Sequence, residues 1–368
     1  MIRVLVVNTV KFMTNGMSNV IIDFYQNMDR SGIAFDFVAN EEIEGKYSNI
    51  IKKNGDRFIL FHNRNKKPFS YIKRLSMLIK KNKYDIIHIH GNSALMSIEL
   101  RAIKKSGSNA KVIVHAHNTD CTHQILNKVL YGYFVNRYDL ALACSEAAGK
   151  WLYKEHSYKV INNGIDEQRF RYQPELRDSL RKNNHLEDKF VITHIGRFNE
   201  QKNHAFLIKI FEFIHRIEPN SVLRLVGTGA LEQKIRQMVS NSEVADYVTF
   251  VGVTDKVELE YQMADVFVLP SLYESFGLVN VEAQCAGLPC VISDTVPRDI
   301  QITEQVKFLS LYDSPEKWAK EILSFKGVHR ESNEDNVTSH HYSIRHEALE
   351  LSDFYYKILA KSSENLQN

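Results

Sequence analysis

The feature that most constrains the fold of this chain is an alternation of short apolar runs and amphipathic segments, which continues along almost its whole length. A first series extends from residue 2 to residue 161, and a second extends from residue 190 to residue 292. Short apolar runs predict buried strands, and the segments between them carry apolar residues at helical spacing. Strands that alternate with helices form parallel sheets with helices on both faces. The sequence therefore predicts an α/β fold.

The interruption between the two series predicts two domains. The length of 368 residues agrees with this, since one domain commonly takes about 100–200 residues. The turn Asn162-Asn163-Gly164 and Pro174 lie in the interruption, and such residues are typical of connections between elements. We therefore expect one Rossmann-like domain over residues 1–168 and another over residues 169–343.

Composition excludes several classes of protein. No apolar run reaches the length of a membrane span, and the N-terminal residues resemble a strand rather than a signal peptide. The chain has four cysteines and no CxxC pair, so we expect free thiols and a cytoplasmic protein. The net charge of +3 is mild, and no nucleic-acid-binding motif accompanies it.

The sharpest candidate site lies in the segment LPSLYESFGLVNVEAQCAGLPCVI, residues 269–292. Glu274 follows a predicted strand, and the next helix is predicted to start near Gly277 and to carry Glu282. Open parallel sheets bind ligands at the carboxyl ends of their strands. The free N–H groups at a helix start favour phosphate, and carboxylates accept hydrogen bonds from sugar hydroxyls. The segment therefore predicts a site for a sugar phosphate.

Seven residues separate the two acids, and this segment resembles the signature of glycosyltransferase family 4, a retaining family with the GT-B fold. In that fold, two Rossmann-like domains face each other across a cleft. The resemblance covers nearly the whole chain and is strongest over residues 190–297. It implies that Glu274 binds hydroxyls of the transferred sugar and that Glu282 holds the ribose of the donor. It also implies that donor contacts come from Phe276, Gly277, Leu278 and Val279.

A second candidate cluster lies at residues 194–203, where Arg197 and Lys202 flank the loop between a predicted strand and a predicted helix. A diphosphate leaving group requires positive charge where its own negative charge grows. The sequence contains no D-x-D motif that would hold a metal ion, so we expect the two cations to supply this charge. The spacing G-R-x-x-x-x-K also resembles the pyrophosphate clamp of the family. We therefore predict a metal-independent enzyme without a cofactor.

Further donor contacts are expected in other loops. Gly16 precedes the first predicted helix, where a phosphate could approach the backbone, although the family usually has two adjacent glycines there. The family resemblance assigns the Gly227-Thr228-Gly229 loop to the nucleotide pocket. It also assigns Gly252 and Val253 to contacts with the base.

His117 follows another strand, and the resemblance places it near the anomeric carbon of the donor as an orienting and charge-stabilising residue. Nearby, His88 and His90 are interpreted as packing residues at the end of a strand, and His115 as structural. A rival hypothesis makes these histidine pairs the ligands of a metal hydrolase. It leaves Arg197 and Lys202 without a role.

Residues 64–83 contain eight lysines and arginines and no acid. Apolar residues recur within them at helical spacing, and this amphipathic pattern has two interpretations. A basic amphipathic helix can lie on an anionic membrane, whereas any surface helix has an apolar stripe that faces the core. The stripe consists of Phe69, Ile72, Leu75, Leu78 and Ile79.

Together these motifs and the family resemblance imply a retaining glycosyltransferase. As the resemblance implies, it would move a hexose or N-acetylhexosamine from a nucleotide diphosphate sugar, preferably UDP-linked, to a lipid-linked glycan acceptor in polysaccharide or capsule assembly. The family resemblance also implies that a helix in residues 344–368 returns to the first domain. The main alternative is an inactive GT-B protein that binds sugar nucleotides or a partner. The oligomeric state stays open.

Overall fold

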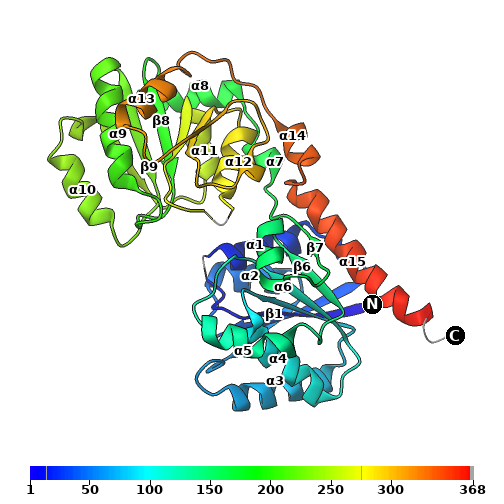
Figure 1. Cartoon of the computed structure of the whole chain (residues 1–368). Helices are drawn as coiled ribbons and strands as arrows, with labels where there is room; N and C mark the ends of the chain where they lie inside the picture. Colours follow the sequence, from blue (N-terminus) through cyan, green and yellow to red (C-terminus); the bar gives the residue numbers. More distant parts are fainter. Residues whose placement is uncertain (14, 275, 365–368) are drawn as a thin grey trace. The chain divides into compact units, whose positions relative to one another are not determined.

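The computed structural model describes residues 1–13, 15–274 and 276–364. The chain forms two compact units, each built on a parallel sheet with helices on both faces (Figure 1). Unit 1 comprises Met1–Gly164 together with the C-terminal segment from Ile344, and unit 2 comprises Ile165–Ser343. The two predicted Rossmann-like α/β domains are confirmed.

The sheet of unit 1 has seven strands in the order β3-β2-β1-β4-β5-β6-β7, and all neighbours are parallel. The order reverses between β1 and β4, and the loops after these strands lie at the carboxyl edge where such sheets bind ligands. The strands are β1 (Ile2–Asn8), β2 (Ile33–Asn40), β3 (Arg57–Phe61), β4 (Ile86–Gly91), β5 (Lys111–Ala116), β6 (Leu140–Ala143) and β7 (Lys159–Val160).

Alternation along the strands creates two cores in unit 1, because successive side chains point to opposite faces of a sheet. Leu5 and Val7 face a core with α3, α4 and α6, whereas Val4 and Val6 face a core with α1, α2 and α15. The helices are α1 (Gly16–Asn27), α2 (Gly45–Lys53), α3 (Pro68–Asn82), α4 (Ser97–Ser106), α5 (Gln124–Phe134), α6 (Glu146–Tyr153) and α15 (Ile344–Glu364), with a short 3-10 turn at Ala94–Met96.

The C-terminal helix α15 belongs to unit 1 and packs against α1. Its buried residues Ile344, Ala348, Leu351 and Tyr355 recur three or four positions apart, so they form one apolar stripe. This stripe covers the face of the sheet that also carries Val4 and Val6.

The sheet of unit 2 has six parallel strands in the order β10-β9-β8-β11-β12-β13. They are β8 (Phe190–Ile195), β9 (Ser221–Val226), β10 (Val248–Gly252), β11 (Val266–Leu269), β12 (Cys290–Ser293) and β13 (Val306–Leu309). The helices are α7 (Glu167–Phe170), α8 (Pro174–Asn183), α9 (His204–Ile217), α10 (Glu232–Ser240), α11 (Val257–Met263), α12 (Leu278–Cys285), α13 (Pro315–Leu323) and α14 (Glu334–Ser339), with 3-10 turns at Ala245–Tyr247 and Arg298–Ile300.

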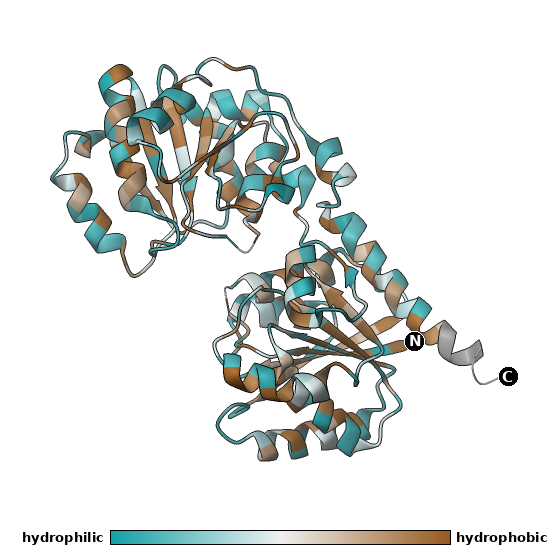
Figure 2. Ribbon diagram, in the orientation of Figure 1, coloured by the Kyte–Doolittle hydropathy of each residue, from teal (hydrophilic) through white to brown (hydrophobic). Residues whose placement is uncertain are grey.

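Hydropathy follows this architecture. Figure 2 shows mainly apolar strands inside each unit, flanked by helices and loops with many hydrophilic positions. Among the residues that the structure describes, no helix is both long enough and apolar enough to cross a membrane.

Candidate functional site

Four loops of unit 2 lie together, because β10, β9, β8 and β11 are neighbours and their carboxyl ends share one edge of the sheet. Backbone hydrogen bonds join the loops to one another. Phe198 N donates to Thr228 O over 3.0 Å, and Leu272 N donates to Gln201 O over 2.7 Å. Gly227 N donates to Gly252 O over 2.8 Å. The loops that carry most of the predicted donor contacts are therefore brought to one place.

Lys202 and Glu274 meet directly in this cluster. The Lys202 Nζ lies 2.6 Å from Glu274 Oε1, and the two side chains are only 13% and 6% exposed. Ser271 Oγ donates to the same carboxylate oxygen over 2.7 Å, and Gln201 Nε2 donates to Oε2 over 3.2 Å. The carboxylate is thus fixed by three donors. The motifs predicted separate targets on the ligand for Lys202 and Glu274, and their ion pair was not anticipated.

Arg197 provides a second positive charge in the same loop. Its side chain is exposed, and it forms no ion pair with any residue that the structure describes. The loop continues to Asn203, which has a positive φ of 53°, and α9 starts at the next residue. An arginine without a counter-ion can bind an anion through several N–H donors.

Gly227 and Gly229 allow the loops to approach one another. A Cβ atom at Gly227 would lie 2.2 Å from the backbone oxygen of Gly196. A Cβ atom at Gly229 would lie 2.4 Å from the backbone oxygen of Phe198. No side chain fits at such distances, so the close packing of two backbones requires glycine at both positions.

Helix α12 begins after Gly277, which has a positive φ of 85°. Its first turn exposes free N–H groups, including those of Leu278 and Val279. Phe276 contributes its backbone only, since its side chain is buried and packs edge-on against Tyr342.

Glu282 lies on α12 and accepts a hydrogen bond of 2.7 Å from Tyr261 Oη. Burial raises the pKa of Tyr261 well above its usual value, as does the negative charge of Glu282, so the phenol keeps its proton and donates it. The Glu282 side chain is half-buried. Tyr261 therefore holds the carboxylate that was predicted to bind the ribose.

Gly252 ends β10 and Val253 follows it, so both lie at the outer part of this edge. Gly252 has a positive φ of 81°, and a Cβ atom there would meet no atom within 4 Å. The Val253 side chain is 73% exposed. The Gly252 carbonyl is already bound by Gly227 N, so this edge offers a base the open space beside Gly252 and the exposed Val253.

Two predicted donor residues belong to unit 1. Gly16 is the first residue of α1, and a Cβ atom there would meet nothing within 4 Å. Asn15 caps this helix by accepting a hydrogen bond from Ser18 N. His117 directly follows β5, and its Nε2 lies 2.8 Å from His90 Nδ1.

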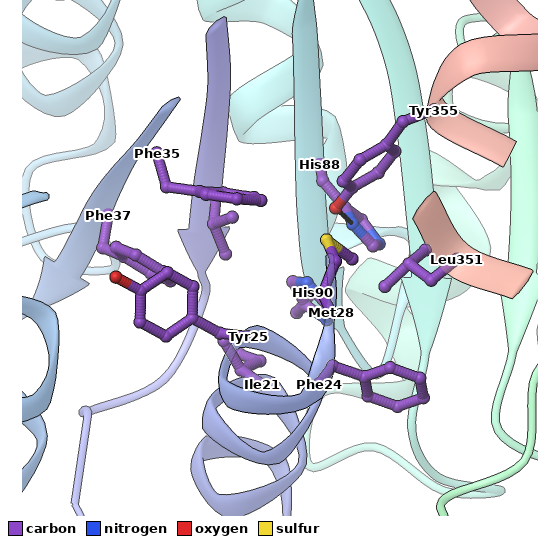
Figure 3. A pocket seen from close by; sticks show the side chains of 11 residues that line it. Ile21, Phe24, Tyr25, Met28, Phe35, Phe37, His88, His90, Leu351 and Tyr355 are labelled. Carbon is purple, nitrogen blue, oxygen red and sulfur yellow. Dashed lines mark hydrogen bonds between the residues drawn. The ribbon is translucent and has the colours of Figure 1, made fainter. Parts of the chain in front are cut away.

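Four histidines form a stacked column on one face of the sheet of unit 1. His88 lies 4.0 Å from His90 between ring centroids, and His115 lies 4.3 Å from His117. Burial lowers the pKa of His88 and that of His117 to about 3, so these rings are neutral near pH 7. Figure 3 shows His88 beside Tyr355 of α15, whose hydroxyl lies 2.8 Å from His88 Nδ1. His90 lines the same cavity.

The metal-hydrolase hypothesis fits this column poorly. His88, His90 and His115 could each place one ligand atom within 4.8 Å of the others. However, the planes of the three rings lie within 32° of one another. Imidazole lone pairs lie in the ring plane, so stacked rings do not direct them to one point, as a tetrahedral metal site requires.

The basic segment proves to be only partly a surface feature. Arg64 is buried and pairs with the buried Glu99, with 2.7 Å between Arg64 Nε and Glu99 Oε1. Ile72, Leu75 and Ile79 pack in the core, which is the second of the two interpretations. Phe69 departs from it, because its side chain is 83% exposed. The exposed cations are Lys66, Lys67, Lys73, Arg74, Lys80, Lys81 and Lys83.

Sequence reasoning missed several residues of the site. Ser271, Gln201 and Tyr261 all hold a proposed ligand-binding carboxylate, yet they carry no charge and were given no role in the sequence analysis. Their only signal is position, since Ser271 follows β11 and Gln201 precedes Lys202. His90 was interpreted as a packing residue, and its bond to His117 was not foreseen.

Comparison with known proteins agrees with this geometry. Residues 14–169 match the family model "Glycosyltransferase Family 4", and residues 177–332 match the model "Glycosyl transferases group 1". The putative glycosyltransferase EpsF of Bacillus subtilis is 28% identical over 87% of this chain and 86% of its own length.

A second relative is an Escherichia coli enzyme named UDP-Gal:alpha-D-GlcNAc-diphosphoundecaprenol alpha-1,3-galactosyltransferase, 28% identical over 60% of each chain. Among solved structures, Anabaena HepE in complex with UDP and glucose superimposes with a TM-score of 0.70 over 99% of both chains, at 17% identity. This likeness confirms the predicted fold.

Proposed function

We infer that the chain is a GT-B glycosyltransferase, because two glycosyltransferase models together match most of it and its fold is that of solved GT-B glycosyltransferases. We propose that it moves a hexose or N-acetylhexosamine from a UDP-sugar to an acceptor hydroxyl and retains the anomeric configuration. The observation that carries the proposal is the convergence of Lys202, Arg197 and Glu274 at one edge of the sheet of unit 2.

The donor would bind across these loops. The exposed guanidinium of Arg197 and the ammonium of Lys202 supply positive charge for the diphosphate. In the unliganded protein Lys202 is paired with Glu274, so a bound diphosphate shares this cation rather than meeting it free. Glu274 then accepts hydrogen bonds from sugar hydroxyls, and Glu282 accepts them from the ribose.

The chemical step needs no enzymic nucleophile. The bond between the anomeric carbon and the leaving phosphate oxygen breaks, and the acceptor oxygen forms its bond to the same face of that carbon. The proton of the acceptor hydroxyl passes to the departing diphosphate. Arg197 and Lys202 stabilise the charge that develops there without a metal ion, and His117 orients the sugar.

We further propose that the acceptor is lipid-linked and belongs to polysaccharide assembly. The name of the Escherichia coli relative describes a diphosphoundecaprenol-linked acceptor. In this chain, α5 starts seven residues after His117 and has an exposed apolar face that suits a lipid. The Ile125, Leu126 and Val129 side chains are 79%, 50% and 72% exposed.

The exposed face of α3 supports a peripheral contact with an anionic membrane. Phe69 and Met77 are 83% and 62% exposed, and Lys73 and Lys80 lie on the same helical face, since these positions follow one another at three- or four-residue intervals. Basic residues attract anionic lipids, and apolar residues between them insert into the interface.

A thermal-shift screen in EDTA tests the donor proposal. UDP-, GDP- and ADP-sugars are compared, since a ligand that binds only the folded state raises its melting temperature. We expect a UDP-hexose or UDP-N-acetylhexosamine to give the largest shift. A shift that requires added divalent metal would contradict the proposed clamp.

A turnover assay then separates an enzyme from an inactive binding protein. The matching donor is incubated with lipid-linked glycans, and the anomeric configuration of the product is read by NMR. Transfer with retention supports the proposal. Donor binding without transfer to any lipid-linked glycan supports the non-catalytic alternative instead.

A further inference from the structure

The histidine column contains one contact that bears directly on the proposed chemistry. His117 Nε2 and His90 Nδ1 lie 2.8 Å apart, and no second hydrogen bond reaches either ring from the described part of the chain. We propose that His90 is a positioning residue that fixes the orientation and the tautomer of His117. This inference rests on the proposed role of His117 at the donor.

The short distance between the two nitrogens requires that one of them carries a proton and the other does not. Two arrangements satisfy this condition. In the first, His90 donates from Nδ1, and His117 accepts at Nε2 and carries its own proton on Nδ1. In the second, His117 donates from Nε2, and its Nδ1 is an acceptor. In both, the state of His117 Nδ1 is set by the proton on His90.

His117 Nδ1 is buried and has no hydrogen-bond partner among the described residues. An imidazole nitrogen left in this state is costly unless something binds it. Burial also lowers the pKa of both rings, so neither gains the second proton that would remove the choice of tautomer. His117 Nδ1 is therefore the one ring nitrogen of His117 that no described residue binds, and its protonation is coupled to the bond with His90.

His90 is itself held rigidly. It lies on β4, is 4% exposed, and is paired in register with His115 on β5. Its ring stacks on His88 at 4.0 Å between centroids. His88 and His90 line one cavity with residues of α1 and α15, as Figure 3 shows. A ring packed in this way keeps Nδ1 of His90 at a fixed place. His117 lies in the loop after β5, and this bond holds its ring more firmly than the loop alone would.

Two variants of His90 separate positioning from packing. His90→Leu removes the bond to His117, whereas His90→Asn keeps an amide near the former Nδ1 position and can renew it. We expect kcat to fall about 10- to 100-fold in His90→Leu, with the donor KM within about twofold of the wild type. His90→Asn should recover most of this loss. Equal losses in both variants would overturn the inference.

A spectroscopic measurement detects the tautomer directly, and its wild-type result does not depend on how the variants fold. In protein with ¹⁵N-labelled histidine, we expect the wild-type His117 ring to show one neutral tautomer at pH 7. In His90→Asn a single tautomer should persist, and in His90→Leu the two nitrogens should give averaged shifts. Averaged shifts in the wild type would contradict the inference.

Two controls distinguish this inference from the proposed function. Tyr355→Phe removes the hydrogen bond to His88 from the other end of the column, so its kcat should stay near the wild-type value. His117→Ala tests the role on which the inference rests. If His117→Ala keeps full activity, the proposed role of His117 is wrong. If His117→Ala is inactive while His90→Leu is fully active, only the positioning role is wrong.

Discussion

The ion pair between Lys202 and Glu274 is nearly buried, so each charge depends on the other for its stability. Taking a carboxylate out of water is costly unless a cation and further donors compensate. Lys202, Ser271 and Gln201 provide that compensation. In the proposed site, the contact that holds Glu274 in place for a sugar therefore also neutralises Lys202, the cation proposed to bind the diphosphate.

Removal of Lys202 should therefore destabilise the protein as well as impair catalysis. We expect Lys202→Ala to lower the free energy of unfolding by about 3 kcal/mol, because the Glu274 charge stays buried without its cation. The double variant Lys202→Met with Glu274→Gln should recover most of this loss. Urea denaturation measures both. A cost below about 0.5 kcal/mol, as for an exposed pair, would show that solvent screens the contact.

His115 gives a second prediction, because neither of its buried ring nitrogens has a hydrogen-bond partner among the described residues. Burial keeps the pKa of His115 well below its usual value, so the unfolded chain takes up a proton below about pH 6.5 that the folded protein does not. The free energy of unfolding should therefore decrease as the pH falls from 7 towards 5.

The variant His115→Leu removes both the unpaired nitrogens and this proton uptake. At pH 7 we expect a free energy of unfolding equal to that of the wild type or up to about 2 kcal/mol higher. Between pH 7 and pH 5, the free energy of unfolding of His115→Leu should decrease less than that of the wild type. In the matched variant His88→Leu, Tyr355 loses its partner, so this protein should be less stable. The prediction is wrong if both variants are equally destabilised.

At the scale of residues, the sequence predicted where the charged residues of the candidate site lie, but it did not predict which side chains they contact. Glu274, Lys202 and Arg197 could be found because charged motifs at the carboxyl ends of parallel strands lie where such sheets bind ligands. The Lys202–Glu274 contact depends on rotamers of side chains 72 positions apart, which no local pattern encodes. The His90–His117 contact was missed for the same reason.

At the scale of elements, the loop glycines of unit 2 test whether close packing of backbones builds the donor site. Gly229→Ala would place a Cβ atom 2.4 Å from Phe198 O, so the loops after β8 and β9 must separate. We expect a loss of about 1–3 kcal/mol in the free energy of unfolding and weaker UDP binding by calorimetry.

Gly16→Ala is the matched control in unit 1, since its Cβ atom would meet nothing within 4 Å. Its stability should change by less than about 0.5 kcal/mol. If a phosphate approaches this helix start, donor turnover should nevertheless decrease. Wild-type UDP binding in Gly229→Ala would show that the packing of these loops does not matter for the donor.

Most elements could be predicted because long buried strands and amphipathic helices have clear periodicity. The missed elements are strand β13 and helices α2, α7, α8, α13 and α14, since all are short and the charged residues in them obscure the pattern. The apolar stripe of α3 could not be assigned to core or membrane, because a pattern of apolar residues does not reveal what covers it.

At the scale of the whole molecule, the break between two series of elements was enough to predict two units. That α15 returns to unit 1 followed from the family resemblance alone. Hydrophobic periodicity predicts a helix at residues 344–359, but it carries no information about which of two sheets buries it.

Membrane association can be tested with the full chain. Lys73→Glu with Lys80→Glu reverses two exposed charges on α3, and each basic residue contributes about 1 kcal/mol at an anionic surface. We expect the wild type to float with vesicles of phosphatidylglycerol and phosphatidylethanolamine, and the variant to float at least tenfold less. Lys209→Glu with Lys234→Glu, on unit 2, should float like the wild type. Equal flotation of all three proteins would contradict a contact through α3.

The central claim is that the loops of unit 2 form one site for a diphospho-sugar without a metal ion. A crystal structure with an intact UDP-hexose, grown in EDTA, tests it most directly. We predict the diphosphate within hydrogen-bond distance of Arg197 and Lys202, the hexose on Glu274 and the ribose on Glu282. A donor bound elsewhere, or a diphosphate that contacts neither cation, would contradict it.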